Sequence, residues 1–189
     1  MRVASSLFIT LIVALGGVAG AQDKSASWLD EVKPASWNTA GSAIPAAPKI
    51  EASADPRCQS GARPPQLEED TRVHERGWDL VGAFQGGWQI LVIRGAAGYD
   101  GMCRPRQYQD FVFVRGVFAG TLSPHPADSR TDGAPMQVFL QSGTRLIAEY
   151  QRYAATDPAC CASRTTTVTF DIASAPPVVR PVSVSTVKR

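Results

Sequence analysis

The sequence has no lysine between Lys49 and Lys188. Over residues 98–172, seven arginines stand against seven acidic residues, so this stretch has no net charge. A surface that binds nucleic acid carries an excess of basic residues. We therefore exclude nucleic acid as a partner and expect most of these arginines to pair with nearby carboxylates.

Motifs for cofactors, metals and catalysis are also missing. The sequence has no phosphate loop, no dinucleotide fingerprint and no C-x2-4-C pair of the kind that holds structural zinc. Residues 128–133 resemble the start of a calcium loop, but Arg130 occupies the third ligand position and Phe139 the twelfth. No catalytic triad and no selected carboxylate pair can be identified. The sequence thus predicts no metal, no cofactor and no enzymatic activity.

Only one hydrophobic run is long enough to suggest targeting. Arg2 precedes the apolar residues 7–15, and small residues ending in Ala19-Gly20-Ala21 follow. This pattern is typical of a cleaved signal peptide, residues 1–21, and the run is too short to span a bilayer. Ala21 stands where a lipoprotein has its acylated cysteine. We expect an exported chain, periplasmic or secreted, with neither a lipid anchor nor a transmembrane segment after cleavage.

Cysteines are few but even in number, namely Cys58, Cys103, Cys160 and Cys161. Because exported thiols are normally paired, they predict two disulfides. A bond within the Cys160-Cys161 doublet ranks last of the three connectivities, since it needs a strained ring. The other two connectivities each join Cys58 and Cys103 to one residue of the doublet, and the sequence does not choose between them.

Composition divides the mature chain into three parts. Residues 22–56 are rich in Ala, Ser and Pro and are interpreted as a linker, although Trp28, Leu29, Val32 and Trp37 leave open a short docking segment. Residues 57–175 form the predicted domain. Residues 176–189 contain three prolines and are interpreted as a tail that adds at most a short edge segment.

Periodicity predicts one helix followed by strands. The helix covers residues 66–76, with acids in its first turn, cations in its last turn and Gly77 beyond it. Two-residue turns at Arg115-Gly116 and Ser142-Gly143 and a glycine-rich turn at residues 85–87 separate predicted strands. The strands are predicted at residues 78–84, 88–94, 111–114, 117–121, 137–141, 144–153 and 165–172. The predicted fold class is therefore α+β: one N-terminal helix packed on a twisted, mainly antiparallel sheet of about seven short strands.

Two loops rich in glycine and charge, residues 98–110 and 123–134, are the candidate binding regions, since function usually sits on long loops held by a rigid frame. Arginine forks in these loops could hold a carboxylate or phosphate, or they could pair internally with the acids. The candidate ligand-binding residues are Asp100, Arg104, Arg106, Asp128, Arg130 and Asp132.

The same region carries a family resemblance. The hairpin F-x-F-x-x-G-x-F-x-G-T at residues 111–121 is its core, and residues 98–105, 128–134, 148–153 and 157–164 add to it. Over residues 77–172 the sequence resembles the LppP/LprE lipoprotein family in its broad sense. The resemblance implies a bacterial cell-envelope location and supplies no activity and no catalytic residue. The missing acylated cysteine departs from the lipoprotein pattern.

Together these features predict a non-enzymatic, exported envelope protein that binds an unidentified ligand or partner through the loops 98–110 and 123–134. An inhibitor of a secreted hydrolase is the first alternative, because small disulfide-closed domains with presented loops suit that role. A hydrolase of envelope polymers is the second alternative. Oligomeric state does not follow from the sequence.

Overall fold

The structure is a computed structural model that describes residues 27–51 and 55–189. The predicted signal peptide, residues 1–21, lies outside the described residues. None of the helices in the described part is both long and apolar enough to span a membrane.

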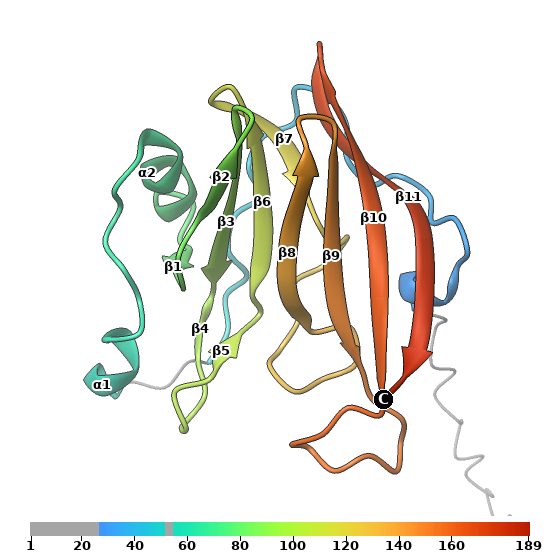
Figure 1. Cartoon of the computed structure of the whole chain (residues 1–189). Helices are drawn as coiled ribbons and strands as arrows, with labels where there is room; N and C mark the ends of the chain where they lie inside the picture. Colours follow the sequence, from blue (N-terminus) through green and yellow to red (C-terminus); the bar gives the residue numbers. More distant parts are fainter. Residues whose placement is uncertain (1–26, 52–54) are drawn as a thin grey trace, which may run out of the picture.

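The described chain is mostly β-structure (Figure 1). Its helical elements are the 3-10 helix η1 (Trp28–Asp30), α1 (Pro56–Gln59) and α2 (Glu68–His74). Its strands are β1 (Asp79–Leu80), β2 (Gln85–Gly87), β3 (Ile90–Ala96), β4 (Gly98–Tyr99), β5 (Pro105–Arg106), β6 (Gln109–Val114), β7 (Val117–Thr121), β8 (Pro135–Ser142), β9 (Arg145–Arg152), β10 (Arg164–Ser174) and β11 (Pro177–Lys188).

The strands form two antiparallel sheets that face each other and a small hairpin. The first sheet has the order β1-β3-β6-β7, with β2 also paired to β3; the second has the order β11-β10-β9-β8; β4 and β5 pair separately. The edges also meet, since β7 lies beside β11 and β2 lies beside β8. The predicted α+β fold with one sheet is therefore wrong. The strand count was underestimated, and the pairing splits into two layers whose inner faces bury each other.

A common apolar core fills the space between the sheets. β10 contributes Val168, Phe170 and Ile172, which alternate with more exposed residues as the sequence predicts for a half-buried strand. Tyr150 of β9 and Val112 of β6 meet them from the neighbouring strand and from the opposite sheet.

A second core lies on the outer face of the first sheet. There, Val73 of α2 packs with Trp78, Ile93, Phe111 and Phe113. Every residue of β6 is buried: Phe111 and Phe113 belong to this cluster, whereas Val112 and Val114 belong to the inner core. Helix α2 thus forms within the predicted range, but it covers only one of two sheets.

The predicted C-terminal tail is strand β11. Val178 and Val179 of this strand are fully buried, and β11 pairs with β10 along its whole length. Pro181 is accommodated because the register shifts beside it, which marks a β-bulge, one of the few places where a paired strand tolerates proline. Proline content therefore misled the composition-based interpretation of residues 176–189.

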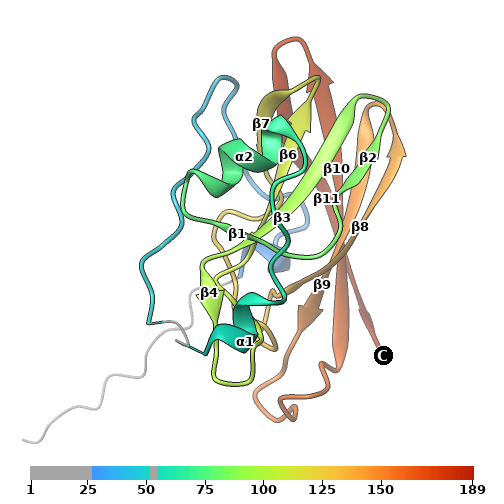
Figure 2. The same cartoon turned by 90° about the vertical axis from the view of Figure 1, so that its left-hand side faces the viewer.

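Residues 27–51, here called the N-terminal strap, pack along the sandwich instead of forming a free linker. Leu29 is 1% exposed and belongs to the inner core. Trp28 packs edge-on against Tyr150, and Trp37 packs edge-on against Phe170. Figure 2 shows the later part of the strap passing beside α2, where the backbone N–H of Ala47 donates to the Arg76 carbonyl at 2.8 Å. Of the two interpretations of this segment, the structure favours docking.

The predicted connectivity of the disulfides is wrong, although their number is right. Cys58 bonds to Cys103, with 4.5 Å between their Cα atoms, and Cys160 bonds to Cys161. Helix α1 lies beside the β4–β5 hairpin, which brings Cys58 to Cys103 (Figure 2). The doublet lies in the exposed loop that joins β9 to β10 of the second sheet, whereas Cys58 and Cys103 lie beside the first sheet.

Candidate functional site

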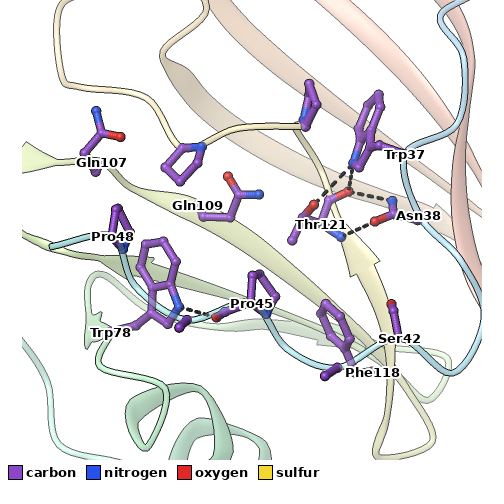
Figure 3. Close-up of a pocket in the computed structure, with 14 residues that line it drawn as sticks. Trp37, Asn38, Ser42, Pro45, Pro48, Trp78, Gln107, Gln109, Phe118 and Thr121 are labelled. Carbon is purple, nitrogen blue, oxygen red and sulfur yellow. Dashed lines mark hydrogen bonds between the residues drawn. The ribbon is translucent and has the colours of Figure 1, made fainter.

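The strap, together with β6, β7 and the loop after β7, lines an open pocket of about 380 Å³ (Figure 3). Trp37, Ser42 and Pro45 line it from the strap, and Gln109 and Phe118 line it from the first sheet. Its volume falls within the range of small-molecule sites, toward the lower end. This pocket is the candidate functional site.

The strap is fixed near its middle by Asn38, which joins the edges of the two sheets. Its amide Nδ2 donates to the backbone carbonyls of Thr121 in β7 at 2.9 Å and of Val179 in β11 at 3.0 Å. Its Oδ1 accepts from the Thr121 N–H at 2.9 Å. The indole N–H of Trp37 also donates to the Thr121 carbonyl, at 3.1 Å. A side-chain amide here supplies the hydrogen bonds that backbone pairing does not supply between the two sheets.

Gly120 permits this close approach. It has a φ of 132°, and a Cβ atom at this position would lie 2.3 Å from the Cγ atom of Asn38. The last glycine of the F-x-F-x-x-G-x-F-x-G-T hairpin is thus required for the Asn38 side chain of the strap to pack against β7.

The strap is fixed again at residues 44–45, against the outer face of the first sheet. The indole N–H of Trp78 donates to the Pro45 carbonyl at 2.9 Å, and Arg76 Nε donates to the Ile44 carbonyl at 3.0 Å. Ile44 itself is buried in the outer core. Between these two attachments run the small residues 39–43, here called the roof, of which Ser42 and Ala43 line the pocket.

Two glutamines are among the polar residues that line the pocket. Gln109 is only 3% exposed; its Nε2 donates to the Ser123 carbonyl and its Oε1 accepts from the Ser123 hydroxyl, both at 2.9 Å. Gln107 Nε2 donates to an Asp128 oxygen at 3.1 Å. These bonds fix both amides and leave one N–H of Gln109 and the carbonyl oxygen of Gln107 for a ligand. In Figure 3 Gln109 lies near the middle of the pocket.

The predicted ligand-binding residues do not line this pocket. At the tip of the β4–β5 hairpin, Asp100 accepts from Arg104 Nε at 2.5 Å and from the backbone N–H groups of Met102 and Arg104 at 2.9 and 3.0 Å. The Arg104 side chain first, and then these N–H groups, hold the pKa of Asp100 at about 2. This pair closes a turn, as the internal-pairing alternative expects.

Arg106 and Asp128 form a second pair, with 3.6 Å between Nε and Oδ1. Arg106 also donates to the Glu51 carbonyl of the strap at 3.0 Å, and Asp128 accepts from the backbone N–H of Gln107 at 2.8 Å. Arg130 lies exposed on the turn that follows, with a φ of 61°. Asp128 therefore orients a pocket residue, while its own charge is used within the fold.

Asp132 lies in a third arrangement, away from the first two pairs. It accepts from Arg152 Nε at 2.9 Å and from the backbone N–H of Tyr153 at 2.8 Å. Arg152 is 2% exposed and also donates to the carboxylate of Asp30 at 2.7 Å, which ties the strap to β9. Burial disfavours its charge, but the two carboxylates outweigh burial and raise the pKa of Arg152.

The six candidates thus do not converge on one ligand. The two predicted loops do meet at the pocket, but through Gln107, Gln109, Pro124 and Pro126 rather than through charged residues. Sequence reasoning missed these residues because neutral amides and prolines carry no chemical motif. The strap's tryptophans were the only signal that could have led to this site.

The opposite edge of the sandwich has its own polar bridge. Arg94 of β3 binds Asp110 of β6 through two hydrogen bonds of 2.7 and 2.8 Å, and its third nitrogen donates to the Met136 carbonyl of β8 at 3.0 Å. Burial lowers the pKa of Arg94, but the charge of Asp110 raises it by more. Because both side chains are engaged, this bridge closes the edge and offers no free charge to a ligand.

Comparison with known proteins finds similarity to one family model over part of the chain. No curated protein and no solved structure matches the chain. Residues 88–175 match the model of the LppP/LprE lipoprotein family, which confirms the resemblance and agrees with an exported cell-envelope protein. The match includes the glutamines and Phe118 but ends before β11 and excludes the strap. Over residues 88–175, this chain is therefore similar to the LppP/LprE lipoprotein family.

Proposed function

We propose that this protein is a non-enzymatic binding module of the bacterial cell envelope and that it holds a small ligand in the pocket beneath the strap. The observation that carries the proposal is the construction of the pocket. The roof is attached at both ends, and the two amides are oriented by neighbours that are themselves fixed. Such preorganisation lowers the entropic cost of binding.

The chemistry of the lining supports binding rather than catalysis. General acid–base catalysis needs a group that titrates near the working pH. The described side chains that line the pocket are amides, hydroxyls, prolines, alanines and aromatic rings without an acidic hydroxyl. The nearby acids, such as Asp128, are held in internal hydrogen bonds.

We also propose that the chain acts without a lipid anchor, in the periplasm or outside the cell. This part of the proposal rests on the sequence, in which Ala21 stands at the position of an acylated cysteine. Incubating cells with radiolabelled palmitate tests it: the protein should stay unlabelled, and label on the isolated chain would refute it.

The binding proposal is tested by filling the pocket. Ala46 is exposed and lines the pocket, so Ala46→Phe should block it without disturbing a core. Ala35 is an exposed strap alanine outside the pocket lining, and Ala35→Phe is the matched control. A low-molecular-mass extract of bacterial envelope should raise the melting temperature of the wild type and of the control, but not that of Ala46→Phe. Equal responses of all three proteins would contradict the proposal.

The β4–β5 hairpin favours one alternative function, inhibition of a secreted hydrolase. Met102 is 70% exposed at its tip, next to the Cys58–Cys103 disulfide and the Asp100–Arg104 pair. An apolar side chain presented on a braced hairpin suits an enzyme cleft. Assays against a panel of secreted proteases and glycosidases test this alternative, which requires inhibition that Met102→Ala abolishes and Ala46→Phe preserves.

A further inference from the structure

We infer that the ligand of the strap pocket is an uncharged sugar ring, such as the terminal unit of an envelope glycan. This inference rests on the proposed function and names the class of ligand. It follows from what the pocket walls can and cannot satisfy.

The first argument is charge. None of the described side chains that line the pocket is ionisable at neutral pH, and Asp128, which contacts Gln107, is already paired with Arg106. An ionic ligand would lose hydration on entering and would find no counter-charge, which costs several kcal/mol per ion in protein interiors. The pocket therefore selects against phosphates, carboxylates and ammonium groups.

The second argument is hydrogen bonding. The Gln109 amide has an N–H to give, the Gln107 carbonyl can accept, and the Ser42 hydroxyl on the roof can do both. An alkyl chain would bury these groups without partners, at a cost of about 1–3 kcal/mol each. Hydroxyl groups, which donate and accept, meet all three.

The third argument is the apolar surface between these polar groups. Pro45, Pro48, Pro124 and Pro126 surround the pocket, and Phe118 and Trp78 contribute ring surface to its walls. A sugar ring presents C–H groups on its faces and hydroxyls at its rim, so it matches apolar walls with a few polar positions. An extended proline-rich peptide also packs on such surfaces. The pocket of about 380 Å³ favours one compact ring system over an extended segment.

Calorimetric titration with probes of one shape and different charge tests the inference. We expect methyl glucoside to bind, and glucuronate, which has the same ring with a carboxylate, to bind at least about tenfold more weakly. Octanol and a proline-rich peptide serve as the apolar and extended probes and should give no heat in the same range. Ala46→Phe should abolish the methyl glucoside signal, and Ala35→Phe should retain it.

A second variant tests the charge argument without touching the buried amides. Ser42 is exposed on the roof, so Ser42→Asp places a carboxylate at the pocket while the fold is kept. This variant should bind glucosamine more tightly than the wild type does, and Ser36→Asp, elsewhere on the strap, should not. Unchanged glucosamine affinity in Ser42→Asp would overturn the argument.

The outcomes separate the inference from the proposed function. If glucuronate binds as well as methyl glucoside, or if only octanol or the peptide binds, the sugar inference is wrong. The proposed binding function would still stand if the envelope extract raised the melting temperature of the wild type but not that of Ala46→Phe. If no probe and no extract distinguishes Ala46→Phe from the wild type, both are wrong.

Discussion

Replacing Asn38 by alanine tests the strap's role in the fold. The change removes two donated hydrogen bonds and one accepted bond, which together connect β7, β11 and the strap. At about 1 kcal/mol net for each bond, and with partial access of water to the site, Asn38→Ala should cost about 2–3 kcal/mol. For a chain of this length that corresponds to a fall in melting temperature of roughly 5–10 °C.

Urea unfolding followed by circular dichroism measures this loss. Thr39→Ala is the matched control, since Thr39 is the exposed neighbour of Asn38 and should change stability by less than about 0.5 kcal/mol. Gly120→Ala adds a second test, because the new methyl group would clash with the Asn38 side chain. Gly120→Ala should therefore be less destabilising in the Asn38→Ala background than in the wild type. Equal stability of Asn38→Ala and Thr39→Ala, together with additive Gly120→Ala effects, would refute the reasoning.

Three further predictions concern the rest of the frame. Cys103→Ser opens a disulfide whose ends are 45 residues apart and should lower the free energy of unfolding by about 4 kcal/mol. Cys160→Ser opens a bond between neighbours and should lower it far less. Equal losses in the two variants would contradict this prediction. Arg94→Met leaves a buried carboxylate unpaired and should cost about 3 kcal/mol by urea titration, while a loss below about 1 kcal/mol would mean that the edge bridge contributes little. Burial opposes the charge of Asp70, but the Arg63 side chain and two backbone N–H groups outweigh burial and lower the pKa of Asp70. The contribution of ionised Asp70 to folding stability is therefore fully present above about pH 4 and is lost as pH falls through the lowered pKa. Asp70→Asn should thus flatten the acid side of the stability profile, and an unchanged profile would count against this pair.

The elements that the sequence predicted well are those with a local signal. The Arg115-Gly116 turn forms between β6 and β7, with φ values of 50° and 76°. The alternation of Val168 and Phe170 with threonines identified β10, because one face of a sandwich strand is buried and the other is not. Helix α2 followed from its charges, and the Asp70 carboxylate in its first turn accepts from the backbone N–H of Leu67, the residue before the helix.

The features that were missed depend on distant contacts. The turn between β2 and β3 falls on Trp88 and Gln89, with φ values of 50° and 63°, whereas the glycines that suggested a turn lie in β2. The strap has the composition of a linker, and only its burial against Tyr150 and Phe170 makes it part of the fold. Cysteine pairing depended on α1 lying beside the β4–β5 hairpin, which no spacing reveals.

The candidate site shows the same division. Sequence analysis selected the loops 98–110 and 123–134, and both contribute to the pocket. It selected charged residues within them, because charge is the visible signal, yet Asp100 and Asp132 are each held by an arginine and by backbone N–H groups. Function is proposed for their neutral neighbours, whose role depends on the strap that covers them.

The most direct test of the account is the thermal response of the pocket-filling variant. Ala46→Phe and Ala35→Phe should melt within a few degrees of the wild type in the absence of ligand. At a ligand concentration one hundred times the dissociation constant, the wild type and Ala35→Phe should gain about 2.7 kcal/mol, or roughly 5–10 °C. Ala46→Phe should gain nothing. A full shift in Ala46→Phe would show that binding takes place elsewhere and would contradict the claim that the strap forms the binding site.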